Sequence, residues 1–182
     1  MQVVKGNGIS ATIVAIPKYK NAKKSNDLWR ILPDSGSDGD LLFVHRDSNK
    51  RIPWNERIAP QKWRTSNGNF KTTKVGVLEL TFPEFFTSKL FSVRPDIVNV
   101  PAEQNKPVYD MILGTETMSN MGVILDFQDK SITIDQISLK MKDLIDFLDS
   151  KSLNNLIKEK SEPSSTRKAT NRAVEILDAR YE

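Results

Sequence analysis

The sequence predicts an all-β domain with one short helix, followed by a C-terminal extension of different character. Short runs rich in β-branched and apolar residues recur from Ser10 to Ile137, and Gly, Pro, Asn and Asp separate them. This pattern is typical of strands joined by tight turns. Within this part, Thr115 to Met121 is compatible with a helix, and Gly122 is a natural helix stop. After Ile137 the spacing of apolar residues becomes helical from Leu139 to Lys158.

The first half of the chain contains the clearest strands. We expect strands at Ser10 to Ile16, Leu28 to Leu32 and Leu41 to Val44, because each is short, apolar and rich in branched residues. The lysine-rich segment from Pro17 to Asp27 is polar, so the first two strands should pair as a hairpin across it. A polar loop should follow from Asp47 to Pro60.

A projecting hairpin is predicted next, around the turn sequence Thr65-Ser66-Asn67-Gly68. Its return arm should continue into a long strand from Lys74 to Phe82. Further strands are expected at Leu90 to Val93, Ile97 to Val100, Val108 to Leu113, Val123 to Phe127 and Ser131 to Ile137. Thr115 is the candidate N-cap of the short helix.

Composition excludes several kinds of chemistry. The chain has 182 residues, no cysteine and one histidine, His45, so disulfides, thiolate chemistry and a clustered imidazole metal site are not expected, and no cofactor is implied. The net charge of +4 is spread over loops and the tail, whereas nucleic-acid binders usually have a denser basic face. We therefore do not expect this domain to bind nucleic acid. No run is long and apolar enough for a membrane span, and no signal peptide follows Met1. We therefore expect an intracellular protein and not a secreted one.

The most informative stretch is an acidic loop between two apolar runs. Asp34-Ser35-Gly36 follows the strand ending at Leu32, and Asp38 lies just before the strand that begins at Leu41. A carboxylate in this place is either a turn former or a catalytic group. The triplet alone does not decide, but it is followed by the glycine-tipped hairpin and by Ile112-Leu113-Gly114 in a fixed order.

That ordered set resembles the retropepsins, the retroviral-type aspartic proteases. The segment from Leu32 to Asp38 is similar to the family's catalytic loop, Ser66-Asn67-Gly68 to its flap tip, and Tyr109 to Phe127 to its closing strand, short helix and last hairpin. The sequence of these segments is most similar to the protease region of gypsy-type LTR retrotransposon Pol polyproteins. The tail from Glu175 to Glu182 resembles the connector that precedes a reverse transcriptase in such polyproteins. We accordingly divide the chain into a retropepsin-like domain at 1–138 and a helical extension and linker at 139–182.

The resemblance implies a closed β-barrel protomer and a homodimeric aspartic endopeptidase that cuts a polyprotein peptide. Asp34 would be the catalytic residue, one from each copy, with Ser35 and Gly36 supporting the loop. Asp38 and the flap-tip residues Ser66, Asn67 and Gly68 would contact the substrate, in a channel with apolar walls. Neither a metal nor a cofactor is required.

One departure from the family pattern leaves alternatives open. Many relatives have Arg after the Ile-Leu-Gly strand, where it can pair with the acid that matches Asp38, but here Thr115 and Glu116 follow. Arg46, Arg51, Arg57 or another basic residue could substitute. Otherwise the chain could be a catalytically silent dimerisation or peptide-binding module on the same fold. A basic accessory segment that contacts nucleic acid is the third alternative.

Overall fold

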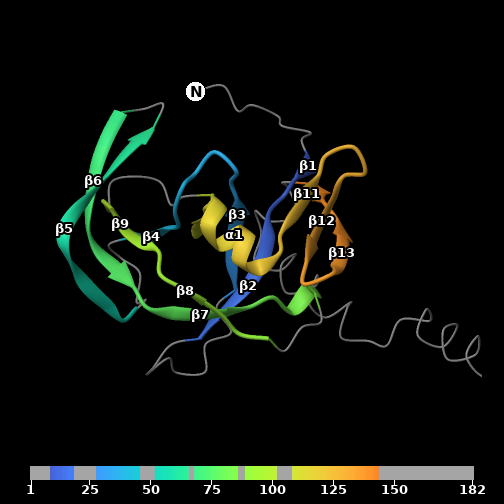
Figure 1. The fold of residues 1–182 in the computed structure, drawn as a ribbon, viewed down its shortest axis with the longest axis horizontal. Helices are drawn as coiled ribbons and strands as arrows, with labels where there is room; N and C mark the ends of the chain where they lie inside the picture. The colour runs from blue at the N-terminus through green and yellow to red at the C-terminus, as the bar shows by residue number, and fades with distance from the viewer. Residues whose placement is uncertain are drawn as a thin grey trace, which may run out of the picture.

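The computed structural model describes residues 9–18, 28–45, 52–65, 68–85, 89–101 and 108–143 (Figure 1). Over these residues the chain is mostly β-strand, with one α-helix, α1 (Thr115–Met121), and one short 3-10 turn, η1 (Pro83–Phe85). The prediction of an all-β domain with one short helix is confirmed. Gly122 ends α1 in the left-handed conformation, at φ 65°, as its position in the sequence predicted.

Three sheets make up the described part of the chain. The large sheet has nine strands in the order β5-β6-β9-β4-β10-β3-β2-β7-β8. Its strands are β2 (Ile13–Lys18), β3 (Trp29–Pro33), β4 (Leu41–His45), β5 (Trp54–Thr65), β6 (Gly68–Gly76), β7 (Leu78–Thr81), β8 (Phe91–Val93), β9 (Asp96–Val100) and β10 (Met111–Leu113). The second sheet is β11 (Ile124–Asp126), β12 (Ser131–Ile134) and β13 (Ile137–Lys140), and the third pairs β1 (Ile9–Ser10) with β14 (Lys142–Asp143).

The centre of the large sheet places the acidic loop. β10 lies between β3 and β4, parallel to β3 and antiparallel to β4. The loop that joins β3 to β4 must therefore cross over the end of β10. In these three strands, Ile31, Leu42, Met111 and Leu113 are fully buried. Burial of each such side chain contributes about 1.5–3 kcal/mol to folding, so the base of the loop is rigid.

Core residues from the second sheet and the helix pack onto the same cluster. Met118 and Met121 of α1 and Ile132 and Ile134 of β12 share it with the central strands. The apolar positions that predicted strands along the sequence are thus the positions that fill one core.

The predicted closed barrel is wrong over the described residues. The large sheet is open, because its end strands, β5 and β8, do not pair with each other. The β5–β6 hairpin has one residue pair in its ladder with β9, Val75 with Asp96. It then projects from the body, as the left side of Figure 1 shows.

Several strand boundaries also differ from prediction, and the predicted strand from Ser131 to Ile137 is divided between β12 and β13 by a turn at Asp135 and Gln136. β5 begins at Trp54, within the expected loop, because its polar residues pair with β6 on an exposed arm. Pro60 is tolerated in the irregular part of this strand, where the register shifts between Glu56 and Gln61. The predicted strand from Lys74 to Phe82 is broken at Val77, whose N–H donates to Pro53 O at 2.9 Å.

The C-terminal prediction is corrected at its start. Leu139 lies in β13, and β14 ends at Asp143, so the helix predicted from Leu139 is wrong as far as Asp143. Lys142 of β14 forms an ion pair with Glu84, a carboxylate buried at 1 % exposure that also accepts the Val14 N–H at 3.0 Å. Residues 144–182 of the predicted extension lie outside the described residues, and the domain division at 138 stays a prediction.

Candidate active site

Backbone hydrogen bonds hold the acidic loop over the end of β10. The Asp34 N–H donates to Leu113 O at 3.0 Å, and the Thr115 N–H donates to Ser37 O at 2.9 Å. The loop therefore meets the chain on both sides of Gly114. A side chain at Gly114 would place its Cβ only 2.5 Å from the backbone of Gly39. The glycine that follows the Ile-Leu pair is thus required by the close approach of two backbones.

Asp34 lies at the start of a tight turn. Its Oδ1 accepts the Gly36 N–H at 2.8 Å, and its carbonyl oxygen accepts the Ser37 N–H at 3.1 Å. The residue is half-buried, whereas Ser35 and Gly36 are exposed. Within the part of the chain that the structure describes, Asp34 Oδ2 makes no hydrogen bond or ion pair. One carboxylate oxygen is therefore fixed by the loop, and the other is available to a substrate or a second carboxylate.

The basic partner that the resemblance implied for Asp38 is not found among the described residues. The Asp38 side chain is exposed and forms no ion pair with any described residue. Arg57, one of the candidates for that role, pairs instead with Asp96, at 2.6 Å between Nε and Oδ1. Arg46 and Arg51 lie outside the described residues.

Asp40, which was not predicted as a site residue, is the structural acid of the loop. Its Oδ1 accepts the Gly114 N–H at 2.8 Å, and its Oδ2 accepts the Thr117 Oγ1–H at 2.6 Å. Burial raises the pKa of this carboxyl group above its ordinary value, the two hydrogen bonds oppose that rise, and the charge of Glu116 adds to it. Gly114, not Thr115, is the N-cap of α1, and no side chain caps it. Asp40 ties the first turn of the helix to the loop.

The predicted hairpin is present and lies against the loop. β5 and β6 pair from Trp54–Gly76 to Thr65–Gly68, and Gly68 has φ +129°, a conformation that favours glycine. Of the predicted tip residues, Gly68 is described, while Ser66 and Asn67 lie outside the described residues.

A buried carboxylate on β9 connects the hairpin to the body. Asp96, which is 1 % exposed, accepts the Trp63 Nε1–H at 3.0 Å on Oδ2 and the Arg57 Nε–H on Oδ1. Its own N–H donates to Asp40 O at 2.9 Å. Neither Asp96 nor Trp63 was predicted as a site residue, because both act through contacts with residues more than thirty positions away.

An open cleft of about 920 Å³ lies between the loop and the hairpin. Asp34 and residues 36–41 line one side, and residues 61–65 of β5 line the other. The segment from β8 to β9 and the first turns of α1 complete it. The walls of this cleft are mixed and largely polar. Its four apolar residues are Leu41, Trp63, Val93 and Ile112. The prediction of apolar walls is therefore wrong for this cleft.

The described ranges contain no group of three His, Asp or Glu side chains that could hold a metal ion. Nor is any helix in them long and apolar enough to cross a membrane. The carboxylates of Asp34, Asp38 and Glu116 all line this cleft, and Asp34 Oδ2 has no partner among the described residues.

Comparison with known proteins gives weak likenesses. No protein-family model matches the sequence, and no curated protein matches it. Among solved structures, the chain is similar to the retroviral protease-like domain of Ddi1 from Leishmania major, at 10 % identity and a TM-score of 0.44, over 76 % of this chain and 96 % of that one. It is also similar to protein Lpg0085 of unknown function from Legionella pneumophila, at 13 % identity and a TM-score of 0.35, over 62 % of this chain and 86 % of that one. Likenesses of this size do not assign the chain to a family.

Proposed function

We propose that this chain is one subunit of a retropepsin-type aspartic endopeptidase that works as a homodimer. The observation that carries the proposal is the position of Asp34 in the cleft beneath the hairpin, with Oδ1 held by the Gly36 N–H and Oδ2 open. The order of loop, hairpin and Ile112-Leu113-Gly114 in the sequence supports the same assignment.

The chemistry explains why a second copy is needed. Hydrolysis of a peptide bond by water needs a base to activate the water and an acid to protonate the carbonyl oxygen or the leaving amine. Two carboxylates held close together cannot both ionise, so the pair shares one proton and supplies both groups, as in aspartic proteases generally. Asp34 from each copy would form this pair. Its titrations would belong to the pair and not to either residue.

The substrate we propose is an extended segment of a polyprotein. The cleft has strand β5 along one side, and an extended peptide can add main-chain hydrogen bonds to such an arm. Asp38 and the tip residues Ser66, Asn67 and Gly68 are proposed to contact this peptide, and Ser35 to stabilise the paired loops. Because the sequence resembles gypsy-type proteases, we propose that this substrate peptide is part of a retroelement polyprotein.

The proposal is tested by peptide cleavage at mildly acidic pH. Asp34→Asn removes the ionisable group and keeps the size of the side chain, so we expect the rate to fall at least about 100-fold. Asp135→Asn is the matched control, because Asp135 is an exposed carboxylate on a turn and pairs with Lys89. Unchanged cleavage by Asp34→Asn would refute the mechanism.

A second candidate function is favoured by one observation. Asp38 has no basic partner among the described residues, and Glu116 stands near the place where relatives carry Arg. A silent peptide-binding or dimerisation module on this fold would show a dimer by sedimentation and would bind an extended peptide. It would hydrolyse none, even with Asp34 intact.

A further inference from the structure

We propose that Trp63 determines specificity by closing the cleft over Gly39, so that the substrate carries a small side chain at one position. This inference rests on the proposed function and adds a substrate class to it. The favoured substrates are extended peptides with Gly, Ala or Ser at that position.

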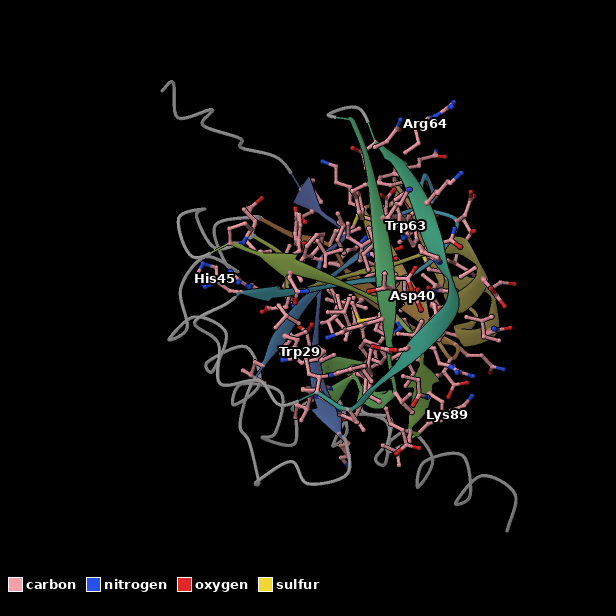
Figure 2. All side chains as sticks on the ribbon, turned by 90° about the vertical axis from the view of Figure 1, so that its left-hand side faces the viewer. Trp29, Asp40, His45, Trp63, Arg64 and Lys89 are labelled. Atoms are coloured by element: carbon pink, nitrogen blue, oxygen red, sulfur yellow. The ribbon has the colours of Figure 1, made fainter. Side chains whose placement is uncertain are left out.

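The indole ring of Trp63 lies directly on the loop. A Cβ built on Gly39 would lie 3.0 Å from Trp63 Cη2 and 3.8 Å from Cζ2. Contacts of that length leave no room for even a methyl group between the ring and the loop. Figure 2, which views the molecule through the hairpin, shows Trp63 between Arg64 near the hairpin tip and Asp40 of the loop.

Hydrogen bonds fix the ring in this position. Its Nε1–H is shared between Thr72 Oγ1 and Asp96 Oδ2, each at 3.0 Å. Thr72 and Asp96 are 3 % and 1 % exposed, so water does not replace these acceptors easily. Phe70 lies opposite Trp63 in the hairpin, with the two rings nearly parallel at 11°. Swinging the indole away would leave the buried Asp96 with one fewer donor, which is costly.

The fixed ring divides the cleft into an open and a closed part. Gly39 is five residues beyond Asp34, and both residues line the cleft together with Trp63. Asp34 borders the open cleft, whereas at Gly39 the hairpin and the loop are in contact. A peptide that runs along the loop past Asp34 must therefore present little side-chain volume where it meets Trp63.

Cleavage of a position-scanning peptide library tests this. Wild type should prefer Gly, Ala or Ser over Leu or Phe at one position near the cut by about tenfold or more. Trp63→Leu should reduce that ratio towards one at that position and leave the preferences at other positions unchanged. Trp63→Phe, which keeps a flat ring but lacks the N–H, should give an intermediate ratio.

The matched control is Trp54→Leu. Trp54 is on the same strand, 44 % exposed, outside the cleft, and stacked under Lys74 Nζ at 3.9 Å. It should leave the ratio unchanged. The ratio compares substrates within one enzyme sample, so a loss of folded protein does not alter it. Wild type that cleaves peptides with large residues equally well at every position would overturn the inference, whereas wild type that cleaves none would refute the proposed function.

Discussion

Arg57 Nε donates to Asp96 Oδ1 at 2.6 Å, so a charged pair joins the hairpin strand β5 to β9. The two side chains are unequally exposed, Arg57 at 33 % and Asp96 at 1 %. The carboxylate also holds the Trp63 indole, and the Asp96 backbone holds the loop through Asp40 O. Removing Arg57 leaves the buried Asp96 unpaired, whereas removing Asp96 leaves only the partly exposed Arg57 unpaired. The first change should therefore destabilise the position of the hairpin more.

Loss of the cation should cost more than loss of the anion. Arg57→Gln leaves a buried, ionised Asp96, which should lower the free energy of unfolding by about 3 kcal/mol. Asp96→Asn leaves Arg57 in contact with water and keeps an oxygen for the Trp63 N–H, so the loss should be about 1–2 kcal/mol. Urea unfolding measures both.

The control for this pair is Lys89→Gln. Lys89 pairs with Asp135 at 3.3 Å, but both side chains are well exposed, so the loss should stay below about 1 kcal/mol. Equal costs for Arg57→Gln and Asp96→Asn would contradict the unequal burial of the two charges.

Gly114 should tolerate no side chain. In Gly114→Ala the new Cβ meets the Gly39 backbone, which cannot yield as a flexible side chain would. We expect a loss of about 3 kcal/mol, at the upper end of the cost of overpacking, and displacement of the loop that carries Asp34.

Gly122→Ala separates this clash from backbone strain. Gly122 has φ +65° with nothing within 4 Å of a new Cβ, so the cost should be about 1–2 kcal/mol without a change in the loop. A Gly114→Ala variant as stable as wild type would show that the two backbones are not held in contact.

Local features of the sequence were enough to predict the framework of the site. The apolar runs beside Asp34, the glycine near the hairpin tip and the Ile112-Leu113-Gly114 strand lie where the pattern predicted them. Each of these features indicates something local: a buried strand, a turn or the close approach of two backbones. Such features predict the structure correctly here because tertiary packing favours the same local conformation.

The contacts that complete the site were not predictable in this way. Trp63 reaches Asp96 across thirty-three positions, and Asp40 reaches Thr117 across seventy-seven. The alternation of side chains along β5 does not show whether the Trp63 indole lies on the loop or in solvent. The closed barrel was wrong for a similar reason, since closure depends on how strands at opposite ends of the sheet meet.

The pKa of Asp40 makes stability depend on pH. Burial raises that pKa above its ordinary value of 3.8, so the folded chain holds this proton more tightly than the unfolded chain does. This contribution to stability therefore falls as pH rises from 3.8 through the raised pKa. Asp40→Asn does not titrate. The free energy of unfolding of the variant minus that of wild type should therefore increase between about pH 4 and about pH 7.

Urea unfolding at several pH values measures this difference. A difference for Asp40→Asn that stays constant with pH, or that decreases as pH rises, would contradict the effect of burial on this group.

The free edge of β11 is the surface on which we expect a second copy. β11 pairs with β12 on one side and with no described strand on the other. Ile124 is 61 % exposed and Phe127 is 71 % exposed, so an apolar pair flanks an unpaired strand edge. Such edges readily pair with another chain. If the proposed homodimer uses this edge, Ile124→Glu and Phe127→Glu should each raise the dimer dissociation constant at least about tenfold, the equivalent of about 1.4 kcal/mol.

Sedimentation and the dependence of cleavage on protein concentration measure this together. A dimer with one Asp34 per subunit loses specific activity on dilution, and the Glu variants should lose it at higher concentrations than wild type. Ile58→Glu is the control, because Ile58 is fully exposed on β5, on the opposite side of Figure 1 from β11. Wild-type activity that is independent of concentration, in a protein that sediments as a monomer, would contradict both the interface and the shared carboxylate pair. Dimerisation unaffected by the two Glu variants would contradict the interface alone.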